Sequence, residues 1–359
     1  MDQEQTPVPA APQPPPPPPP PRPQADNSGG KVSPIWLVAV GCALMLSLLF
    51  NLLLFVGLMG AATASVGASE VGMLEEKLVD GKSDAKDKVV VIPIHGVIME
   101  TMGAGPGTVS QVIAMLKKAA DDDSIKAVIL DIDSPGGGVT ASDRIFHELK
   151  LFKDKEKLPI VSMFGDVAAS GGYYVAMASD HIVAHETSIT GSIGVISQFY
   201  NFHDAMTKLG VKVNTIKSLN SEGKESFKDI GSPYRPMTDP ERKLLQGLIT
   251  EMWGRFTEVV AEGRKGKLTP EQVKKLADGR VFTGPQALEQ KLVDTIGYRQ
   301  DAYKIARELA KSPDAKVVLY KRSPTLSELL SLRSNPPGSE LLEMFSKNSP
   351  RFLYLWTGG

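Results

Sequence analysis

A serine that could act as a nucleophile lies in a glycine-rich turn of this chain. Ser170 belongs to the run Gly165–Tyr174, in which small residues precede the serine and two glycines follow it. The residues before the turn, Pro159–Phe164, have the pattern of a buried strand, and Tyr174–Ser179 have that of a helix. At a strand-to-helix turn, backbone N–H groups and the helix dipole can stabilise a developing oxyanion. The run does not match the G-x-S-x-G elbow, so a plain glycine-rich helix cap is the alternative interpretation.

A second glycine-rich turn, Pro135–Gly138, follows another strand-like run, Ala127–Ile132, and a helical pattern begins near Thr140. If the two strands are neighbours in a parallel sheet, both turns project at the same end. Ser170 then faces the N–H groups of the first turn, and Gly171 offers another. Glycine lets a substrate carbonyl approach the backbone closely. The turn lacks the phosphate-loop and dinucleotide patterns, and we expect no cofactor and no metal ion.

A nucleophilic serine needs a base. The histidines of the chain are His95, His147, His181, His185 and His203. None lies in a glycine-rich or turn-rich segment, which disfavours a Ser-His-Asp triad. The other route is a Ser–Lys pair, in which a desolvated lysine takes the serine proton. Lys217, Lys224 and Lys228 lie in one segment after the serine turn, although a solvated surface charge is the commoner role of a single lysine.

Taken in order, five motifs of the chain resemble those of the signal peptide peptidase A family of serine proteases. They are Ser134–Gly138, Ala168–Tyr174, Thr190–Val195, Phe227–Pro233 and Ala277–Gly284. The resemblance covers roughly residues 88–311. It implies an α/β fold, the Clp/crotonase superhelix of repeated β-β-α units. It also implies the short form of the family, with one serine-bearing unit, which assembles into a ring.

The resemblance assigns roles to single residues. Ser170 takes the position of the nucleophile and Lys228 that of the general base, with Lys224 as the alternative base. In this family serine and lysine can come from adjacent units, so oligomerisation can itself complete the site. The other matched positions are those of the oxyanion donors, Gly137 and Gly171, and of a hydroxyl that orients the lysine, Ser192.

The N-terminal part of the chain predicts a membrane anchor. Residues 1–31 form a proline-rich tail, which we expect to act as an extended spacer, and residues 35–58 are almost wholly apolar. At about 1.5 Å per residue this stretch can cross ~30 Å of hydrocarbon. A cleavable signal peptide is the alternative, with Ala62–Ala64 as a cleavage site. The long proline-rich leader and the length of the apolar stretch favour an uncleaved anchor.

Basic residues flank this predicted span unevenly. Arg22 and Lys31 precede it, and Lys77 is the first basic residue after it. This favours a cytoplasmic N-terminus and a catalytic body outside the cytoplasm. We therefore predict a single-pass protein of the cell membrane.

The remaining pattern predicts a polar linker at 70–87, a peptidase domain at 88–311 and a C-terminal extension at 312–359. Strands alternate with helices without hairpin signals, which is typical of an α/β protein. Further strand-like runs are Ile193–Ser197 and Val211–Ile216. The apolar end, Phe352–Trp356, is too hydrophobic to stay in water, and we expect it to dock on a neighbouring subunit or in the substrate groove.

Charge and cysteine content narrow the functional class. Forty basic and 41 acidic side chains give a net charge of −1, which offers no electrostatic argument for nucleic acid as a partner. The single cysteine, Cys42, excludes an intramolecular disulfide. The resemblance predicts a membrane-anchored serine endopeptidase that hydrolyses remnant signal peptides or other hydrophobic peptides. A crotonase-like acyl-CoA enzyme and a catalytically silent membrane scaffold are the alternatives.

Overall fold

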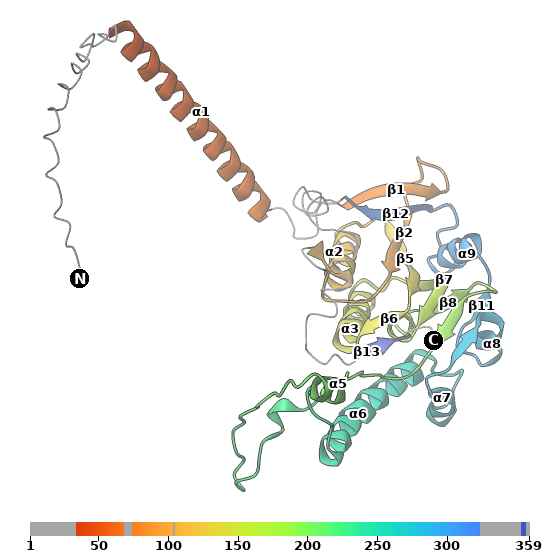
Figure 1. Cartoon of the computed structure of the whole chain (residues 1–359). Helices are drawn as coiled ribbons and strands as arrows, with labels where there is room; N and C mark the ends of the chain where they lie inside the picture. Colours follow the sequence, from red (N-terminus) through yellow and green to blue (C-terminus); the bar gives the residue numbers. More distant parts are fainter. Residues whose placement is uncertain (1–33, 68–73, 103–104, 324–352, 357–359) are drawn as a thin grey trace, which may run out of the picture. The chain divides into compact units, whose positions relative to one another are not determined.

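The computed structural model describes residues 34–67, 74–102, 105–323 and 353–356. They belong to two compact units, one holding the N-terminal helix and one holding a body of mixed α and β structure (Figure 1). The predicted proline-rich tail, residues 1–31, lies outside the described residues.

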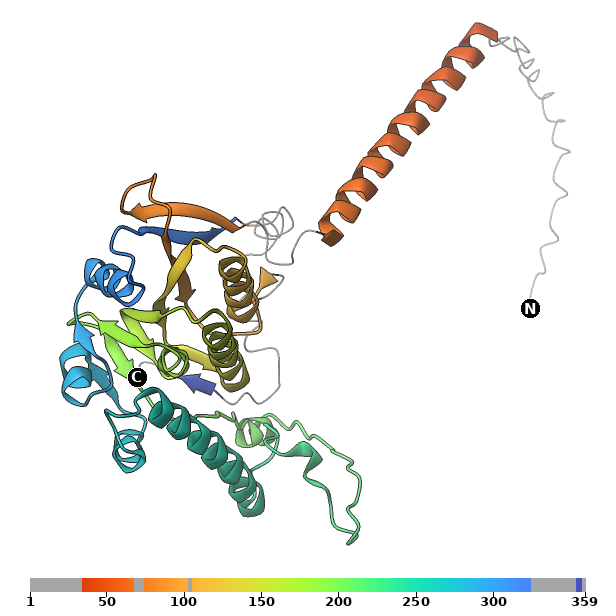
Figure 2. The ribbon, with the colours of Figure 1, turned by 180° about the vertical axis from the view of Figure 1, so that it is seen from behind.

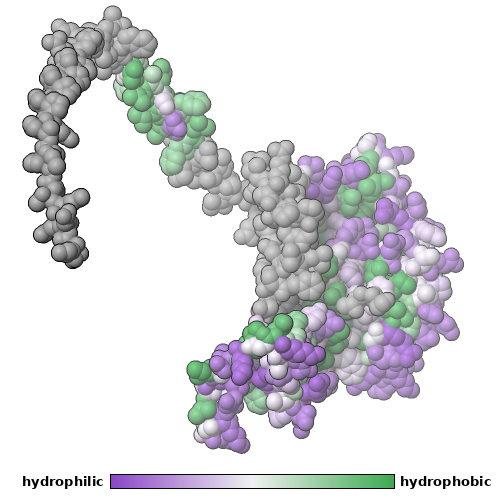
Figure 3. Space-filling model, in the orientation of Figure 1, coloured by the Kyte–Doolittle hydropathy of each residue, from purple (hydrophilic) through white to green (hydrophobic). Residues whose placement is uncertain are grey.

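The N-terminal unit contains one long helix, α1 (Pro34–Gly67). By length and composition its stretch Val38–Phe55 is apolar enough to cross a membrane, and within the described residues α1 is the one helix that meets this condition. Its described side chains form an almost wholly hydrophobic surface (Figure 3). The helix includes the predicted span, residues 35–58, and continues beyond it.

The body is built on a large sheet. Its strands are β1 (Leu74–Asp80), β2 (Lys88–His95), β5 (Ile125–Ser134), β7 (Ile160–Ala169), β8 (His181–Ala184), β9 (Ile189–Gly191), β10 (Val281–Thr283), β11 (Thr295–Ile296) and β12 (Lys316–Arg322). The order along the sheet is β1-β12-β2-β5-β7-β8-β11, with β9 joined to β7 and β10 to β9. Strands β2, β5, β7 and β8 are parallel, because helices rather than hairpins connect them. The predicted α/β alternation is confirmed.

Two smaller sheets lie outside this one. They join β3 (Thr101–Met102) to β4 (Gly105–Pro106), and β6 (Gly136–Gly138) to β13 (Leu353–Leu355). The second pair brings the C-terminal end of the chain beside the glycine-rich turn that follows β5.

Helices cover both faces of the large sheet (Figures 1 and 2). The helices of the body are α2 (Thr108–Ala120), α3 (Val139–Glu156), α4 (Gly171–Ala176), α5 (His203–Lys208), α6 (Asp239–Gly263), α7 (Pro270–Leu276), α8 (Gly284–Glu289) and α9 (Arg299–Leu309). Along β2, Val90 and Ile92 belong to the hydrophobic core that also includes residues of α2, α3, α4 and α6, whereas Val89 and Val91 belong to the core that includes residues of α9. Because the strand is buried on both faces, its sequence reads as a continuous apolar run.

The structure corrects both predicted boundaries of the body. The segment 70–87, predicted as a linker, contains β1, and the predicted extension 312–359 contains β12. The two strands pair antiparallel with each other, and β12 pairs parallel with β2. Most of β1 is exposed at the sheet edge, so its charged side chains are compatible with a strand. The described sheet therefore extends beyond residues 88–311 at both ends.

Two predicted strand-like runs form no strand in the described chain. Ile193–Ser197 contributes one bridge, through Ile196, and Val211–Ile216 lies in an irregular segment. The latter is part of residues 197–238, here called the arm, which carries α5 and the short helix η1 (Phe227–Asp229). The arm projects from the sheet and its helices in both views (Figures 1 and 2). Its alternating pattern lacks a partner strand among the described residues.

Candidate active site

Ser170 occupies the turn between β7 and α4, as the sequence predicts. Its backbone has φ 52° and ψ −114°, a conformation that costs a residue with a side chain about 1–3 kcal/mol. The Ser170 N–H donates to the Gly191 carbonyl at 2.8 Å, and its own carbonyl accepts from the Tyr174 N–H at 2.8 Å. Only 1% of the residue is exposed. The turn therefore holds a buried serine in a strained conformation that the surrounding backbone enforces.

Ser192 directly follows the neighbouring strand, β9. β9 runs parallel to the end of β7 and places Gly191 opposite Ala169, so the serines that follow these two residues are neighbours. Ser192 also has a positive φ, 49°, and its N–H donates to the Arg280 carbonyl at 2.8 Å. The fold thus brings a second buried hydroxyl next to the predicted nucleophile.

The other glycine-rich turn leaves the same end of the sheet. β5 pairs parallel with β7 and places Ser134 opposite Ala168, so β6 begins at the edge where the serine turn lies. The Ser134 hydroxyl fastens this turn, because it donates to the Gly96 carbonyl at 2.6 Å and accepts from the Gly136 N–H at 3.1 Å. The predicted placement of the two turns at one end of a parallel sheet is confirmed.

The predicted oxyanion donors, Gly137 and Gly171, come close together. A Cβ atom built on Gly171 would lie 3.1 Å from the Gly137 nitrogen and 2.4 Å from Ser142 Oγ. A Cβ atom on Gly137 would lie 2.0 Å from the Ile98 carbonyl oxygen, because Ile98 pairs with β6. Neither position has room for a side chain. The two backbone amides therefore meet beside the serine turn at positions that require glycine.

Two of the three lysines considered as a base, Lys217 and Lys224, are held in ion pairs. Lys217 Nζ lies 2.9 Å from an Asp229 carboxylate oxygen and 2.8 Å from one of Glu225. The hydrogen bond to Asp229, followed by that to Glu225, raises the pKa of Lys217 and keeps the amine charged. Lys224 Nζ lies 2.9 Å from a Glu222 carboxylate oxygen at the surface. These pairs make Lys217 the least suited of the three to accept a proton.

Lys228 lies in η1 and is exposed. Its Nζ forms no hydrogen bond or ion pair with any residue that the structure describes, and the same part of the chain offers no hydrogen-bond partner to Ser170 Oγ. The single chain carries the predicted nucleophile at the end of a sheet strand and the predicted base on the arm. Within the described residues no hydrogen bond connects the two side chains.

The described histidines do not supply a base for Ser170. His95 faces Asp131 at 3.5 Å, and His181 is hydrogen-bonded to the Thr295 hydroxyl at 2.8 Å. No hydrogen bond links any of the five histidines to Ser170 within the described chain. The geometry thus gives no support to a Ser-His-Asp triad.

A strand from the C-terminal end of the chain lies against the glycine turn. β13 pairs antiparallel with β6 and places Tyr354 opposite Gly137. On the other edge of β13, Leu353 and Ile196 exchange two backbone hydrogen bonds, of 3.0 and 3.1 Å. We call this position between β6 and Ile196 the strand site. It accepts an extended peptide through main-chain bonds on both edges.

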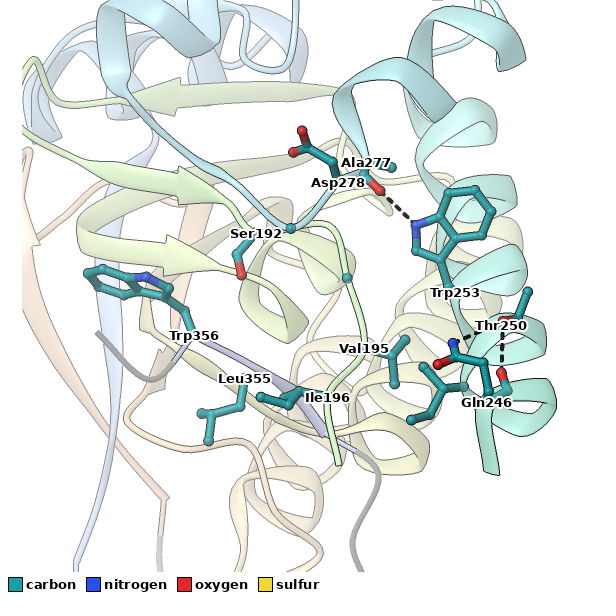
Figure 4. A pocket seen from close by; sticks show the side chains of 13 residues that line it. Ser192, Val195, Ile196, Gln246, Thr250, Trp253, Ala277, Asp278, Leu355 and Trp356 are labelled. Carbon is teal, nitrogen blue, oxygen red and sulfur yellow. Dashed lines mark hydrogen bonds between the residues drawn. The ribbon is translucent and has the colours of Figure 1, made fainter. Parts of the chain in front are cut away.

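A cavity of about 460 Å³ opens beside the strand site. Figure 4 shows α6, with Thr250 and Trp253, on one side of it and Leu355 and Trp356 of the tail on the other. Ser192 lines the cavity between these two walls. The hydroxyl predicted to orient the base therefore faces an open space next to a bound strand.

Comparison with known proteins decides the family. The pattern of peptidase family S49 matches residues 152–312, and that of the NfeD1b N-terminal domain matches residues 88–214. The chain is 38% identical over 264 residues to an Enterococcus faecium protein named as a signal peptide peptidase SppA, which covers 72% of this chain and 73% of that protein. The chain belongs to peptidase family S49.

Other relatives are named as proteases. A Synechocystis protein is 40% identical over 238 residues, with 66% of this chain and 80% of that protein covered. The chloroplastic serine protease SPPA of Arabidopsis thaliana is 32% identical over 260 residues, with 70% of this chain and 37% of that protein covered. This S49 protein is a serine protease, and the acyl-CoA enzyme and silent scaffold are set aside.

One part of this S49 site was not predicted. Ile98 forms the far wall of the glycine turn, since its N–H donates to the Gly136 carbonyl and its carbonyl accepts from the Gly138 N–H. The sequence places Ile98 just after a strand, where it gives no sign of pairing with a distant turn. For the apolar end, the sequence predicts docking at one of two positions, a neighbouring subunit or the substrate groove. The strand site, which the described part of this end occupies, corresponds to the groove.

Proposed function

We propose that this S49 protease is a membrane-anchored endopeptidase that hydrolyses remnant signal peptides and other apolar peptides, with Ser170 as nucleophile and Lys228 as general base. The observation that carries the proposal is the strand site, where a peptide strand is bonded on both edges next to the serine turn. Proteases that bind extended substrates hold them by such strand addition.

The proposed reaction uses a Ser–Lys pair. Ser170 Oγ attacks the carbonyl carbon of the bound peptide while its proton passes to the neutral amine of Lys228, which Ser192 orients. The amides of Gly137 and Gly171 donate to the oxyanion, and one such donor contributes on the order of 3 kcal/mol to lowering the barrier. The C–N bond then breaks, the leaving amine takes the proton from Lys228, and the acyl group stays on Ser170. Water hydrolyses this ester with the same base, which frees the acid and restores the serine.

In this account Lys228 reaches Ser170 from a neighbouring copy of the chain. The arm carries large exposed apolar side chains, among them Ile216, 97% exposed, and Leu209, 78% exposed. Figure 3 shows hydrophobic surface on this projecting part of the body. Exposed apolar side chains gathered on one segment are a feature of interaction sites. A ring of copies, with each arm on the next body, covers them and completes each site.

The remaining parts of the proposal concern the anchor and the fold. α1 holds the protein in the cell membrane as a single span, with the catalytic body outside the cytoplasm, as the bias of Arg22, Lys31 and Lys77 favours. The body belongs to the Clp/crotonase superhelix of repeated β-β-α units. Its substrates are apolar peptides that reach it from the adjacent bilayer.

Peptide hydrolysis by the full chain in detergent tests the proposal. Ser170→Ala should reduce kcat/KM by several orders of magnitude without lowering the melting temperature, because only the attacking oxygen is removed. Ser162→Ala, which removes another buried serine hydroxyl from β7, the strand that leads to Ser170, is the matched control and should retain hydrolysis. If Ser170→Ala keeps activity within about tenfold of wild type, Ser170 is not the nucleophile.

A further inference from the structure

The segment that carries Lys228 has little structure of its own. η1 is a single short turn of 3₁₀ helix, and both Phe227 and Lys228 are exposed. Such a turn has poorer hydrogen-bond geometry than an α-helix and fixes several backbone dihedral angles for few hydrogen bonds. The direction of the Lys228 side chain therefore depends on what holds η1 to the rest of the chain.

Asp229, the residue after Lys228, is the point at which η1 is held. One of its carboxylate oxygens lies 2.9 Å from Lys217 Nζ, and the other accepts from Arg235 Nε at 2.8 Å. Because a 3₁₀ helix has about three residues per turn, neighbouring side chains point about a third of a turn apart. Asp229 is bonded within the arm, and this turns the Lys228 side chain toward the surface.

Arg235 connects this point to α6. Its Nε donates to Asp229, and its Nη1 donates to a Glu241 carboxylate oxygen at 2.8 Å. Its Nη2 pairs with the other Glu241 oxygen. A planar guanidinium bridges two carboxylates in a fixed geometry, whereas the ammonium of a lysine is a single point charge. The hydrogen bonds from Arg235 are the main reason that the pKa of Asp229 lies below its usual range and that the pKa of Glu241 is about 2.

Glu241 belongs to a fixed part of the body. Its side chain is 4% exposed, and it closes the capping box of α6 by accepting from the Thr238 N–H at 2.9 Å. Further along the same helix, Phe256 and Val260 belong to the hydrophobic core. The contacts thus run from the residue beside the proposed base, through Arg235, to a helix that is anchored in the core.

We infer that Arg235 is the positioning residue for the proposed base, Lys228. By bridging Asp229 and Glu241, it fixes the direction in which the arm presents the lysine amine to the nucleophile. The inference rests on the proposed function, in which Lys228 takes the serine proton, and it adds the residue that places this amine. Proton transfer depends steeply on such placement, since an error of about 1 Å can lower the rate on the order of a hundredfold.

A double-mutant cycle on the labelling of Ser170 tests the inference. A fluorophosphonate reacts with the full chain in detergent, and the labelling rate measures how reactive Ser170 is. Arg235→Met should slow labelling by roughly 10–100-fold. In a Lys228→Ala chain the same substitution should change the rate by less than about twofold, because no lysine is left to position. Arg242→Met, at an exposed arginine next to Glu241 on α6, is the matched control and should label like the wild type.

Peptide hydrolysis gives a second measurement. Arg235→Met should lower kcat and leave KM within about twofold of wild type, because the peptide is held by the strand site and not by the arm. If this variant does not assemble at the wild-type size in sedimentation, Glu241→Gln takes its place. Glutamine at this position retains the capping box and removes the charge that holds Arg235, so it should give the same pattern with a smaller loss.

The outcomes separate the positioning role from the proposed function. If Lys228→Ala labels and hydrolyses like the wild type, the proposed base is wrong and the inference is wrong with it. If Lys228→Ala is inactive while Arg235→Met and Glu241→Gln label within about twofold of wild type, the base stands and the positioning role is overturned. An equal loss from Arg235→Met with and without Lys228 also overturns it, because the arginine then acts independently of the lysine.

Discussion

At the scale of single residues, Ser170 combines a reactive side chain with an unfavourable backbone. A φ of 52° for a serine is tolerated because its N–H is tied to Gly191 and the next strand ends beside it. Strain of about 1–3 kcal/mol at one residue must be offset by the packing around it. The same geometry keeps the hydroxyl at the end of the sheet, where the amides of Gly137 and Gly171 converge.

The base is tested by substitution of Lys228. Lys228→Ala should abolish turnover, and Lys228→Arg should not restore it, because a guanidinium stays protonated and accepts no proton. Lys224→Ala is the control on the same segment and should stay active. If Lys224→Ala is inactive while Lys228→Ala hydrolyses peptides, the base has been assigned to the wrong lysine.

At the scale of elements, the buried strands were predictable because their apolar runs are short and end in turns. β5 and β7 lie where the sequence predicts strands, and the two glycine turns follow from their parallel order. β1 was missed because an edge strand is mostly exposed and can be charged. Val211–Ile216 was expected as a strand because of its alternating pattern. The prediction was wrong because such a pattern forms a strand only where a partner strand exists. The strand site needs β13 and β6 together, which pairs residues too distant in sequence for a local pattern to reveal.

The end of α6 is fixed to the sheet by a buried charge pair, and this gives a stability prediction. The side chains of Arg264 and Asp294 are 2% and 8% exposed. Arg264 Nη2 lies 2.7 Å from Asp294 Oδ1. Burial alone would raise the pKa of Asp294, but hydrogen bonds from Arg264 and then Lys267 outweigh it and hold the pKa at about 2. Asp294→Asn should cost roughly 3–5 kcal/mol of unfolding free energy at neutral pH, because Arg264 is left buried without its partner.

The pH dependence of this pair follows from the lowered pKa. Since the folded pKa is about 2 and the ordinary value is 3.8, the stabilisation is complete above pH 3.8 and is lost as the pH falls through about 2. Denaturation at several pH values should show that the difference in unfolding free energy between wild type and Asp294→Asn becomes smaller over that range. Asp314→Asn, at an exposed position, is the control and should change stability little. A gap that stays constant from pH 5 to about pH 2 would contradict the assignment.

The tail makes a prediction about kinetics. If β13 fills the strand site of its own body, it competes with substrate, so deleting Pro350–Gly359 should lower KM and leave kcat unchanged. Deleting Thr357–Gly359 alone keeps Tyr354 in place and is the control. An unchanged KM with smaller particles in sedimentation would mean that the tail supports the ring. Unchanged kinetics and unchanged sedimentation would mean that it is passive.

At the scale of the whole molecule, the separation of Ser170 from Lys228 predicts complementation between copies. Ser170→Ala and Lys228→Ala chains should each be inactive, but co-assembled in equal amounts they should regain roughly one quarter of wild-type activity, since about that share of interfaces joins an intact serine to an intact lysine. Co-expression with two affinity tags isolates the mixed assemblies. If mixed assemblies are no more active than either parent, the lysine does not act across an interface.

Covalent labelling of the full chain with a fluorophosphonate tests the central claim, that Ser170 is the nucleophile of this S49 protease. An activated serine displaces fluoride and keeps the phosphonyl group, which mass spectrometry of the digested protein can locate. The account predicts one labelled serine, Ser170, with no labelling in Ser170→Ala and slower labelling in Lys228→Ala. Label on another serine, or a chain that hydrolyses peptides while Ser170 stays unmodified, would contradict it.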